Sequence, residues 1–306
     1  MAIVQTDIPM TSQRCIDTIL KITETYPFCR SEELTTTAFG RSIRTLVIGS
    51  GPRKVLYTAA HHANEWITTP VLLKFGEELA SAIQSGGRIF DTQATTLADT
   101  ATIYMIPMVD PDGVDLVTGA IEPGQLEYEA AHRLADNYPA IPFPNGWKAN
   151  LLGTDLNLNY PAGWLQARET KFSQGFTCPG PRDYVGRAPL NQRETRALAG
   201  YTEVIDPVLV LAYHSQGQVI YWQFEDYEIP GAKELGQRFA QVSGYELADT
   251  PFESAFAGYK DWFIQQFRRP GYTIEVGIGE NPLPLSQFDR IYRDNLGILV
   301  TAALGE

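Results

Sequence analysis

Positive charge, histidine and cysteine are scarce in this chain, and long hydrophobic runs are absent. Of its 306 residues, 24 are Lys or Arg and 36 are Asp or Glu, which gives a net charge of −12. An acidic chain is repelled by nucleic acid and by anionic membrane surfaces, so neither is expected as the main partner. No apolar run approaches the roughly 20 residues that a membrane-spanning helix needs, which argues against a transmembrane segment.

The N-terminal residues indicate where the protein is located in the cell. Residues 1–10 lack the basic and apolar segments of a secretory signal, which predicts a cytoplasmic protein unless the chain is a mature or truncated form.

The chain has three cysteines. Cys15, Cys29 and Cys178 cannot all pair, and their spacing matches no zinc knuckle. We interpret them as free thiols, with a Cys15–Cys29 disulfide as the alternative.

The pattern of apolar residues predicts an α/β fold. Helical and strand patterns alternate along the chain, no internal repeat is present, and 44% of the residues are hydrophobic. We therefore expect a single domain over residues 1–306, with a mixed, mostly parallel, twisted central sheet of about eight strands and helices on both faces. Residues 49–52, Gly-Ser-Gly-Pro, indicate a hairpin between strands at 42–48 and 54–60.

Further elements follow from apolar periodicity and end signals. Thr11 or Ser12 is expected to cap a first helix with an apolar face of Ile16, Ile19, Leu20 and Ile22. Strands are also predicted at 101–108, 208–213, 219–222 and 272–276, and helices at 69–79, 191–201, 233–242, 260–267 and 288–304. Residues 114–155 are rich in Pro, Gly and Asn with one short helical piece, and so long a loop is usually functional.

Two histidines and one glutamate form a pattern typical of catalytic zinc. His62 and Glu65 can turn a ring nitrogen and a carboxylate oxygen onto one cation, and such sites often use two histidines and a glutamate with water as fourth ligand. His214 ends an apolar strand, where active sites of open α/β sheets are built. The predicted ligands of one Zn²⁺ are therefore His62, Glu65 and His214. The remaining histidines are interpreted as structural (His61) and surface-exposed (His132).

Glu275 lies inside an apolar strand, where an unpartnered carboxylate is unfavourable. One interpretation is a salt-bridged or edge-facing glutamate. The other is the general base of a metal hydrolase, which the three predicted zinc ligands favour.

These residues stand in an order that resembles the zinc carboxypeptidases of the carboxypeptidase A type, over nearly the whole chain. The matching segments are 62–66, 107–113 with Asp110 in place of an asparagine, 153–160, 214–215, the Asp261-Trp262 pair, and Glu275. The resemblance implies the family's fold, one zinc ion per chain, and Glu275 as the catalytic glutamate.

Departures from the family's pattern concern the substrate. Leu158 stands where carboxypeptidases have the arginine that binds the substrate's terminal carboxylate, and Lys148 stands where another arginine steadies the oxyanion. The tyrosine that closes over substrate has no match, since Glu253 aligns there with Phe252 beside it. A leucine cannot pair with a carboxylate, which argues against an ordinary carboxypeptidase.

The segments 147–150, 155–159 and 214–217 resemble the bacterial γ-D-glutamyl-L-diamino acid endopeptidases. That resemblance implies hydrolysis of the bond between the γ-carboxyl of D-glutamate and diaminopimelate or lysine, in peptidoglycan stem peptides or muropeptides. Lys148 would share the oxyanion charge with zinc. The residues expected to bind substrate are Asn157, Leu158, Lys260, Gln216 and Gly217. Recycling of muropeptides inside the cell is the expected setting, with a cell-wall or spore location if the chain is truncated.

Alternatives remain open from the sequence. The first is a carboxypeptidase for ordinary peptides, against which Leu158 argues. The second is a zinc amino-acid deacylase, against which the match over 155–160 argues. The third is a non-enzymatic wall-binding or zinc-binding protein, against which the intact Glu275 argues. Lys260 would read the acidic end of diaminopimelate or be a solvated lysine at a helix start. Asp110 and Asp112 would hold a second metal or, more simply, form a Pro-Asp-Gly turn.

Overall fold

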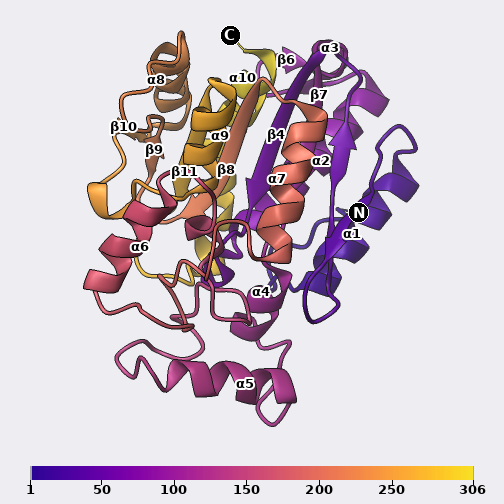
Figure 1. Cartoon of the computed structure of the whole chain (residues 1–306). Helices are drawn as coiled ribbons and strands as arrows, with labels where there is room; N and C mark the ends of the chain where they lie inside the picture. Colours follow the sequence, from indigo (N-terminus) through magenta and orange to yellow (C-terminus); the bar gives the residue numbers. More distant parts are fainter. Residues whose placement is uncertain (1, 306) are drawn as a thin grey trace.

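The computed structural model describes residues 2–305 and is built on a seven-stranded central sheet (Figure 1). Its strand order is β10-β9-β11-β8-β4-β7-β3. In chain order the strands are β3 (Leu46–Ile48), β4 (Arg53–Ala59), β7 (Ala101–Ile106), β8 (Leu209–Ser215), β9 (Val219–Tyr221), β10 (Glu246–Ala248) and β11 (Gly271–Val276). The expected α/β architecture with a mixed sheet is confirmed.

Strand directions make the sheet mostly parallel. β7, β4, β8 and β11 run parallel in that order, β3 and β9 are antiparallel to their neighbours β7 and β11, and β10 is parallel to β9. The hairpin predicted at residues 49–52 is wrong, because β7 lies between β3 and β4. The strand predicted at 42–48 is split: β2 (Ser42–Arg44) leaves to pair with β1 (Glu33–Thr36), and β3 alone joins the central sheet.

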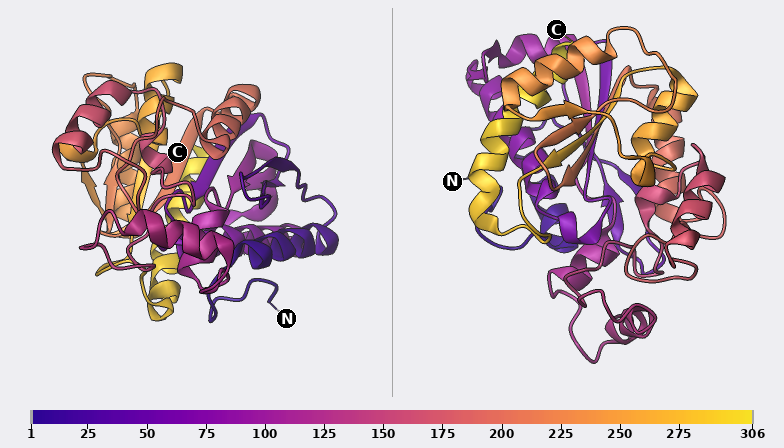
Figure 2. Two further views of the ribbon diagram at one scale, coloured as in Figure 1. Left: turned by 60° about the horizontal axis from the view of Figure 1, so that its bottom comes forward. Right: turned by 90° about the vertical axis from the view of Figure 1, so that its left-hand side faces the viewer.

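Helices cover both faces of the sheet, as predicted (Figure 2). Side chains of β4 alternate between two cores, with Val55 and Tyr57 on one face and Leu56 on the other. The first face packs on α1 (Ser12–Thr25), α2 (Thr68–Ser85), α3 (Ala94–Thr100), α8 (Ala232–Ser243) and α10 (Phe288–Leu304). The second packs on α7 (Arg193–Ile205) and α9 (Tyr259–Phe267).

Helix α1 begins as predicted but buries a different face. The Thr11 hydroxyl caps it by accepting from the Arg14 amide. Ile19 and Ile22 are buried with Cys15, whereas Leu20 is 46% exposed. The stripe at i, i+4 and i+7 starts from Cys15, so a residue one step beyond Ile19 is turned about 100° away. Cys15 and Cys29 are buried free thiols, which confirms the interpretation of the cysteines.

The segment between β7 and α6 holds more structure than predicted. Asp110 begins α4 (Pro111–Val117) by accepting a hydrogen bond from the Gly113 amide, so the predicted turn is wrong. α5 (Leu126–Ala135), which carries the exposed His132, stands apart from the sheet at one end of the molecule (Figure 2). α6 (Trp164–Ser173) follows a loop whose Leu156 and Tyr160 pack in the core on the second face of the sheet.

The remaining elements are short. A two-stranded sheet is formed by β5 (Arg88–Ile89) and β6 (Thr92–Gln93), and single turns of 3₁₀ helix are η1 (Ala63–Glu65), η2 (Leu156–Leu158), η3 (Phe252–Ser254) and η4 (Leu285–Gln287). Within residues 2–305, no helix has both the length and the apolar character to cross a membrane.

Candidate metal centre

Two chain segments bring the predicted zinc ligands to the carboxyl ends of neighbouring parallel strands. His62 and Glu65 lie at η1, between β4 and α2, and His214 lies near the end of β8, the neighbour of β4. Glu275 is in β11 and pairs in register with His214. The carboxyl edge of an open α/β sheet is where such sites form, because loops there leave a crevice.

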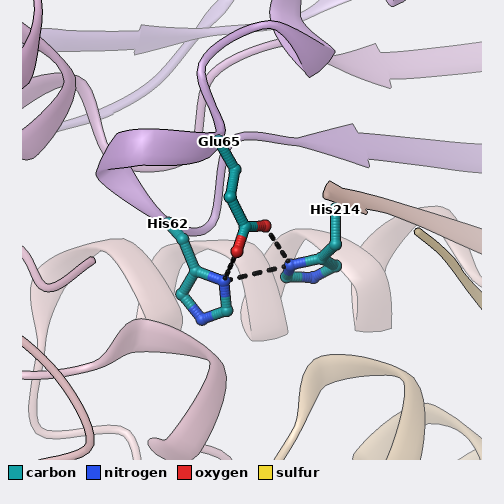
Figure 3. Close-up of side chains that lie close together, drawn as sticks. All are labelled: His62, Glu65 and His214. Carbon is teal, nitrogen blue, oxygen red and sulfur yellow. Dashed lines mark hydrogen bonds and ion pairs between the residues drawn. The ribbon is translucent and has the colours of Figure 1, made fainter. Parts of the chain in front are cut away.

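The ligand atoms converge on one point (Figure 3). His62 Nδ1 lies 2.9 Å from Glu65 Oε1, His214 Nδ1 lies 2.9 Å from Glu65 Oε2, and the two Nδ1 atoms are 3.2 Å apart. Within residues 2–305, these three are the group of buried His, Cys, Asp or Glu side chains that could hold a metal ion, with ligand atoms within 4.8 Å of one another.

This donor set fits zinc. Ligands about 2.0–2.2 Å from a tetrahedral Zn²⁺ lie roughly 3.3 Å from each other, close to the separations seen here. Two imidazoles and one carboxylate are ligands typical of catalytic zinc, and three protein ligands leave a fourth position open. His62, Glu65 and His214 are therefore the residues that would hold the ion.

Neighbouring groups fix the orientation of the ligands. Asp155 Oδ1 lies 3.0 Å from His62 Nε2, so the carboxylate accepts the Nε2 proton and leaves Nδ1 to face the other ligands. The Ser215 amide donates to Glu65 Oε2 at 3.1 Å. Asp155 also caps η2 by accepting from the Asn157 amide. Asp155 has no role in the prediction from sequence, although it stands in the motif matched over residues 153–160.

The charges at the site favour a cation. Burial alone would lower the pKa of His62, but the carboxylates of Glu65 and Asp155 outweigh it and raise that pKa to about 9. Burial alone would raise the pKa of the Glu65 carboxyl, yet His62 and Lys148 hold that pKa well below the usual range. The negative charge that retains a proton on His62 also attracts a metal ion, which would replace that proton.

The metal ligands open into a cavity of about 880 Å³ that is also lined by Glu275 and Lys148. Burial and the nearby Glu65 carboxylate raise the pKa of Glu275 to about 8. Lys148 Nζ lies 3.6 Å from Glu65 Oε1. The two predicted catalytic residues thus share one cavity with the three ligands, an arrangement suited to proton transfer and charge stabilisation beside a metal.

Four of the five predicted substrate-binding residues line the cavity. Asn157, Leu158, Lys260 and Gln216 line the cavity, whereas Gly217 is not among the lining residues and its amide donates to the carbonyl of Gly277. Leu158 is 8% exposed and packs in a cluster with Trp164, Ala167, Val185 and Ala257.

Asn157 and Lys260 are both held by the protein. The Asn157 side-chain oxygen accepts from the Tyr259 amide at 3.0 Å, which leaves its NH₂ group for the cavity. Lys260 is only 3% exposed, so its interpretation as a solvated lysine is wrong. Its ammonium donates to the carbonyl of Gln223 at 2.6 Å and pairs with Asp261.

His61, Asp110 and Asp112 lie outside the ligand set. His61 is buried, stacks on His214 and Tyr259, and bonds to the hydroxyl of Tyr160, as a structural histidine does. Asp112 pairs with Arg41 at 3.0 Å. Glu253 and Phe252, at the position of the absent tyrosine, do not line the cavity.

Comparisons with known proteins agree with this geometry. The zinc carboxypeptidase family matches residues 16–297. The chain belongs to this family. It is a zinc metallopeptidase, and the family's zinc requirement agrees with the ligand cluster of His62, Glu65 and His214.

One relative is similar over most of both sequences. The γ-D-glutamyl-L-diamino acid endopeptidase 1 of Lysinibacillus sphaericus is 42% identical over 284 residues, which cover 92% of this chain and 69% of that protein.

Solved structures share the fold of this zinc metallopeptidase. Thrombin-activatable fibrinolysis inhibitor superposes with a TM-score of 0.76 at 16% identity, over 99% of this chain and 76% of that one. Murein-tripeptide amidase MpaA of Escherichia coli O157 superposes with a TM-score of 0.54 at 18% identity, over 88% and 91%.

Proposed function

We propose that the chain, as one catalytic domain of residues 1–306, hydrolyses the amide bond between the γ-carboxyl of D-glutamate and diaminopimelate or lysine in peptidoglycan stem peptides. The observation that carries the proposal is Leu158: a buried apolar side chain lines the cavity where carboxypeptidases have a carboxylate-binding arginine. The 42% identity to an endopeptidase named for this bond supports the choice of substrate.

One zinc ion held by His62, Glu65 and His214 would supply Lewis acidity and lower the pKa of a coordinated water to about 7. Glu275, in the wall of the same cavity, takes the proton of the attacking water and passes it to the leaving amine.

Lys148 balances the negative charge that develops on the carbonyl oxygen. Burial lowers the pKa of its ammonium, but the carboxylates of Glu65 and Asp155 outweigh burial and raise it, so the group stays charged. A fixed cation in the cavity stabilises an oxyanion, and loss of one such donor typically lowers the rate about 100-fold or more.

The diamino acid is held on the side of the cavity formed by Asn157, Lys260 and Gln216. The NH₂ group of Asn157 donates to the carbonyl or carboxylate that follows the cleaved bond. Lys260 faces the acidic end of diaminopimelate. Leu158 supplies apolar contact to the aliphatic part of the diamino acid chain.

The proposal is tested with the tripeptide L-Ala-γ-D-Glu-diaminopimelate and the variant Glu275→Gln. We expect this variant to retain zinc, measured by elemental analysis, because Glu275 is not among the ligands. Its turnover should fall at least about 1,000-fold, because general base catalysis is removed and the amide cannot accept the proton. Near-normal hydrolysis by a zinc-loaded Glu275→Gln protein would contradict the role of Glu275.

A further inference from the structure

Arg182 is a cation in the cavity that the proposed mechanism does not use. It lies in the loop between α6 and α7 and lines the same cavity as the metal ligands. Its Nε donates to Asp183 at 2.6 Å, and 40% of its side chain is exposed. Within residues 2–305, no hydrogen bond or ion pair engages its Nη1 or Nη2. The two outer nitrogens of the guanidinium are therefore available to a ligand.

The loop that carries Arg182 is held in place by its neighbours. Asp183, which orients Arg182, also pairs with the buried Lys171 at 2.8 Å. The Asp183 amide contacts Asp155, the partner of His62, at 3.4 Å. An arginine fixed through Nε presents its outer nitrogens with little loss of conformational entropy on binding, as a carboxylate receptor requires.

The position of Arg182 relates it to the acyl side of the substrate. The carbonyl of Pro181 accepts from the amides of Lys148 and Ala149, at 2.7 and 3.0 Å, so the Arg182 loop and the Lys148 segment lie side by side. In the proposed function Lys148 serves the carbonyl oxygen of the scissile bond. Lys260 is held by Gln223 and Asp261, which belong to other parts of the chain.

A γ-glutamyl linkage carries a charge that an ordinary peptide bond lacks. When D-glutamate is joined through its side-chain carboxyl, its α-carboxylate stays free, three carbons from the scissile carbonyl on the acyl side. A buried or half-buried carboxylate needs a cationic partner. The net charge of −12 makes a local cation more necessary, because the chain as a whole repels an anionic substrate.

We infer that Arg182 binds the free α-carboxylate of the D-glutamyl residue and so selects γ-linked over α-linked substrates; this rests on the proposed function. Nη1 and Nη2 donate to the two carboxylate oxygens, which is a geometry that guanidinium and carboxylate share. Leu158 removes recognition of a C-terminal carboxylate on the leaving side, and Arg182 provides recognition of a carboxylate on the acyl side.

The test compares two tripeptides, L-Ala-γ-D-Glu-diaminopimelate and its analogue in which the D-glutamyl α-carboxylate is a carboxamide. Wild-type protein is expected to cleave the carboxylate form with a kcat/KM about 10- to 100-fold higher, the range for hydrogen bonds to a charged group. In Arg182→Gln this preference should disappear through loss of the carboxylate substrate alone, while the carboxamide is cleaved as before. Arg182→Lys should keep part of the preference, since an ammonium retains charge but not the fork.

Arg187→Gln is the matched control, because Arg187 is exposed in the same loop and does not line the cavity. It should leave both kcat/KM values unchanged. Equal losses on both tripeptides in Arg182→Gln would mean that Arg182 only supports the loop, and a wild type without preference would equally overturn the inference. If wild-type protein cleaves neither tripeptide, the proposed function itself fails, which is a different result from a preference that survives in Arg182→Gln.

Discussion

The Glu65 carboxylate contacts most of the charged and polar groups around the candidate metal site. It contacts both histidine ligands, accepts from the Ser215 amide and lies near Lys148. Glu275 is the second carboxylate in the same cavity, and its raised pKa follows from burial and from Glu65. The two glutamates thus differ in charge, because the pKa of Glu65 is held well below its usual range while that of Glu275 is raised.

The Glu275 pKa predicts how stability depends on pH in protein stripped of metal by a chelator. The folded pKa is about 8 against an ordinary value of 4.5, so the folded state holds this proton more tightly than the unfolded state. Its contribution to stability is present below about pH 4.5 and is lost as pH rises to about 8. Glu275→Gln cannot ionise at this position. The melting temperature of the variant minus that of the wild type should therefore increase as pH rises through this window and stay constant above it.

Thermal melts of the two metal-free proteins, measured by circular dichroism at a series of pH values, check this expectation. A difference in melting temperature that is constant from acid to alkaline pH would show that Glu275 titrates normally.

Single residues also show the limits of sequence reasoning about the site. The placement of His62, Glu65, His214 and Glu275 in one cavity was predictable, because metal and base chemistry restricts the residue types and strand ends restrict their places. The placement of Arg182 in that cavity was not, because it stands in an irregular loop whose path depends on contacts with Lys148 and Asp155. Lys260 was ambiguous for a related reason: a lysine at a helix start is usually solvated, and only the tertiary fold buries it.

The connection between β3 and β4 explains why a turn signal was misread. Glycines at 49 and 51 were interpreted as a hairpin, but the chain uses them to pass close to the end of α3. The Ser50 and Gly51 amides donate to the carbonyl of Ala98. A Cβ on Gly51 would lie 2.1 Å from the carbonyl carbon of Thr100, so no side chain fits there. Local sequence cannot distinguish a turn glycine from one needed for close approach.

Gly51→Ala should therefore destabilise the protein by about 1–3 kcal/mol or more, because backbone atoms must move to admit the methyl group. Gly200→Ala is the control: a Cβ there meets nothing within 4 Å, and helix α7 should gain roughly 0.5–1 kcal/mol. Urea unfolding of both variants measures the two free energies. Equal stability of Gly51→Ala and wild type would contradict the packing described for this connection.

At the scale of the whole molecule, the metal site joins segments far apart in the sequence. His62 and Glu65 follow β4, and His214 comes about 150 residues later in β8, as the 152-residue separation of the two histidines shows. A ligand that binds only the native state stabilises it by mass action, by about 4 kcal/mol when its concentration is 1,000 times its dissociation constant.

Removal of zinc should lower the melting temperature, and added zinc should restore it. Differential scanning calorimetry with and without a chelator measures the shift. His214→Ala removes one of the three ligands and should show little response to chelator or zinc. A wild-type melting temperature that stays the same after zinc has been removed, as verified by elemental analysis, would argue against a native zinc site at these residues.

The central claim is that this zinc metallopeptidase cleaves the γ-D-glutamyl–diamino acid bond, and its most direct test is a comparison of defined substrates by mass spectrometry. We predict that L-Ala-γ-D-Glu-diaminopimelate, or its lysine analogue, yields L-Ala-D-Glu and the free diamino acid, while a hippuryl amino acid and the α-linked isomer of the tripeptide are cleaved far more slowly. Efficient release of the C-terminal residue from the hippuryl substrate, with the γ-linked tripeptides left intact, would contradict the account.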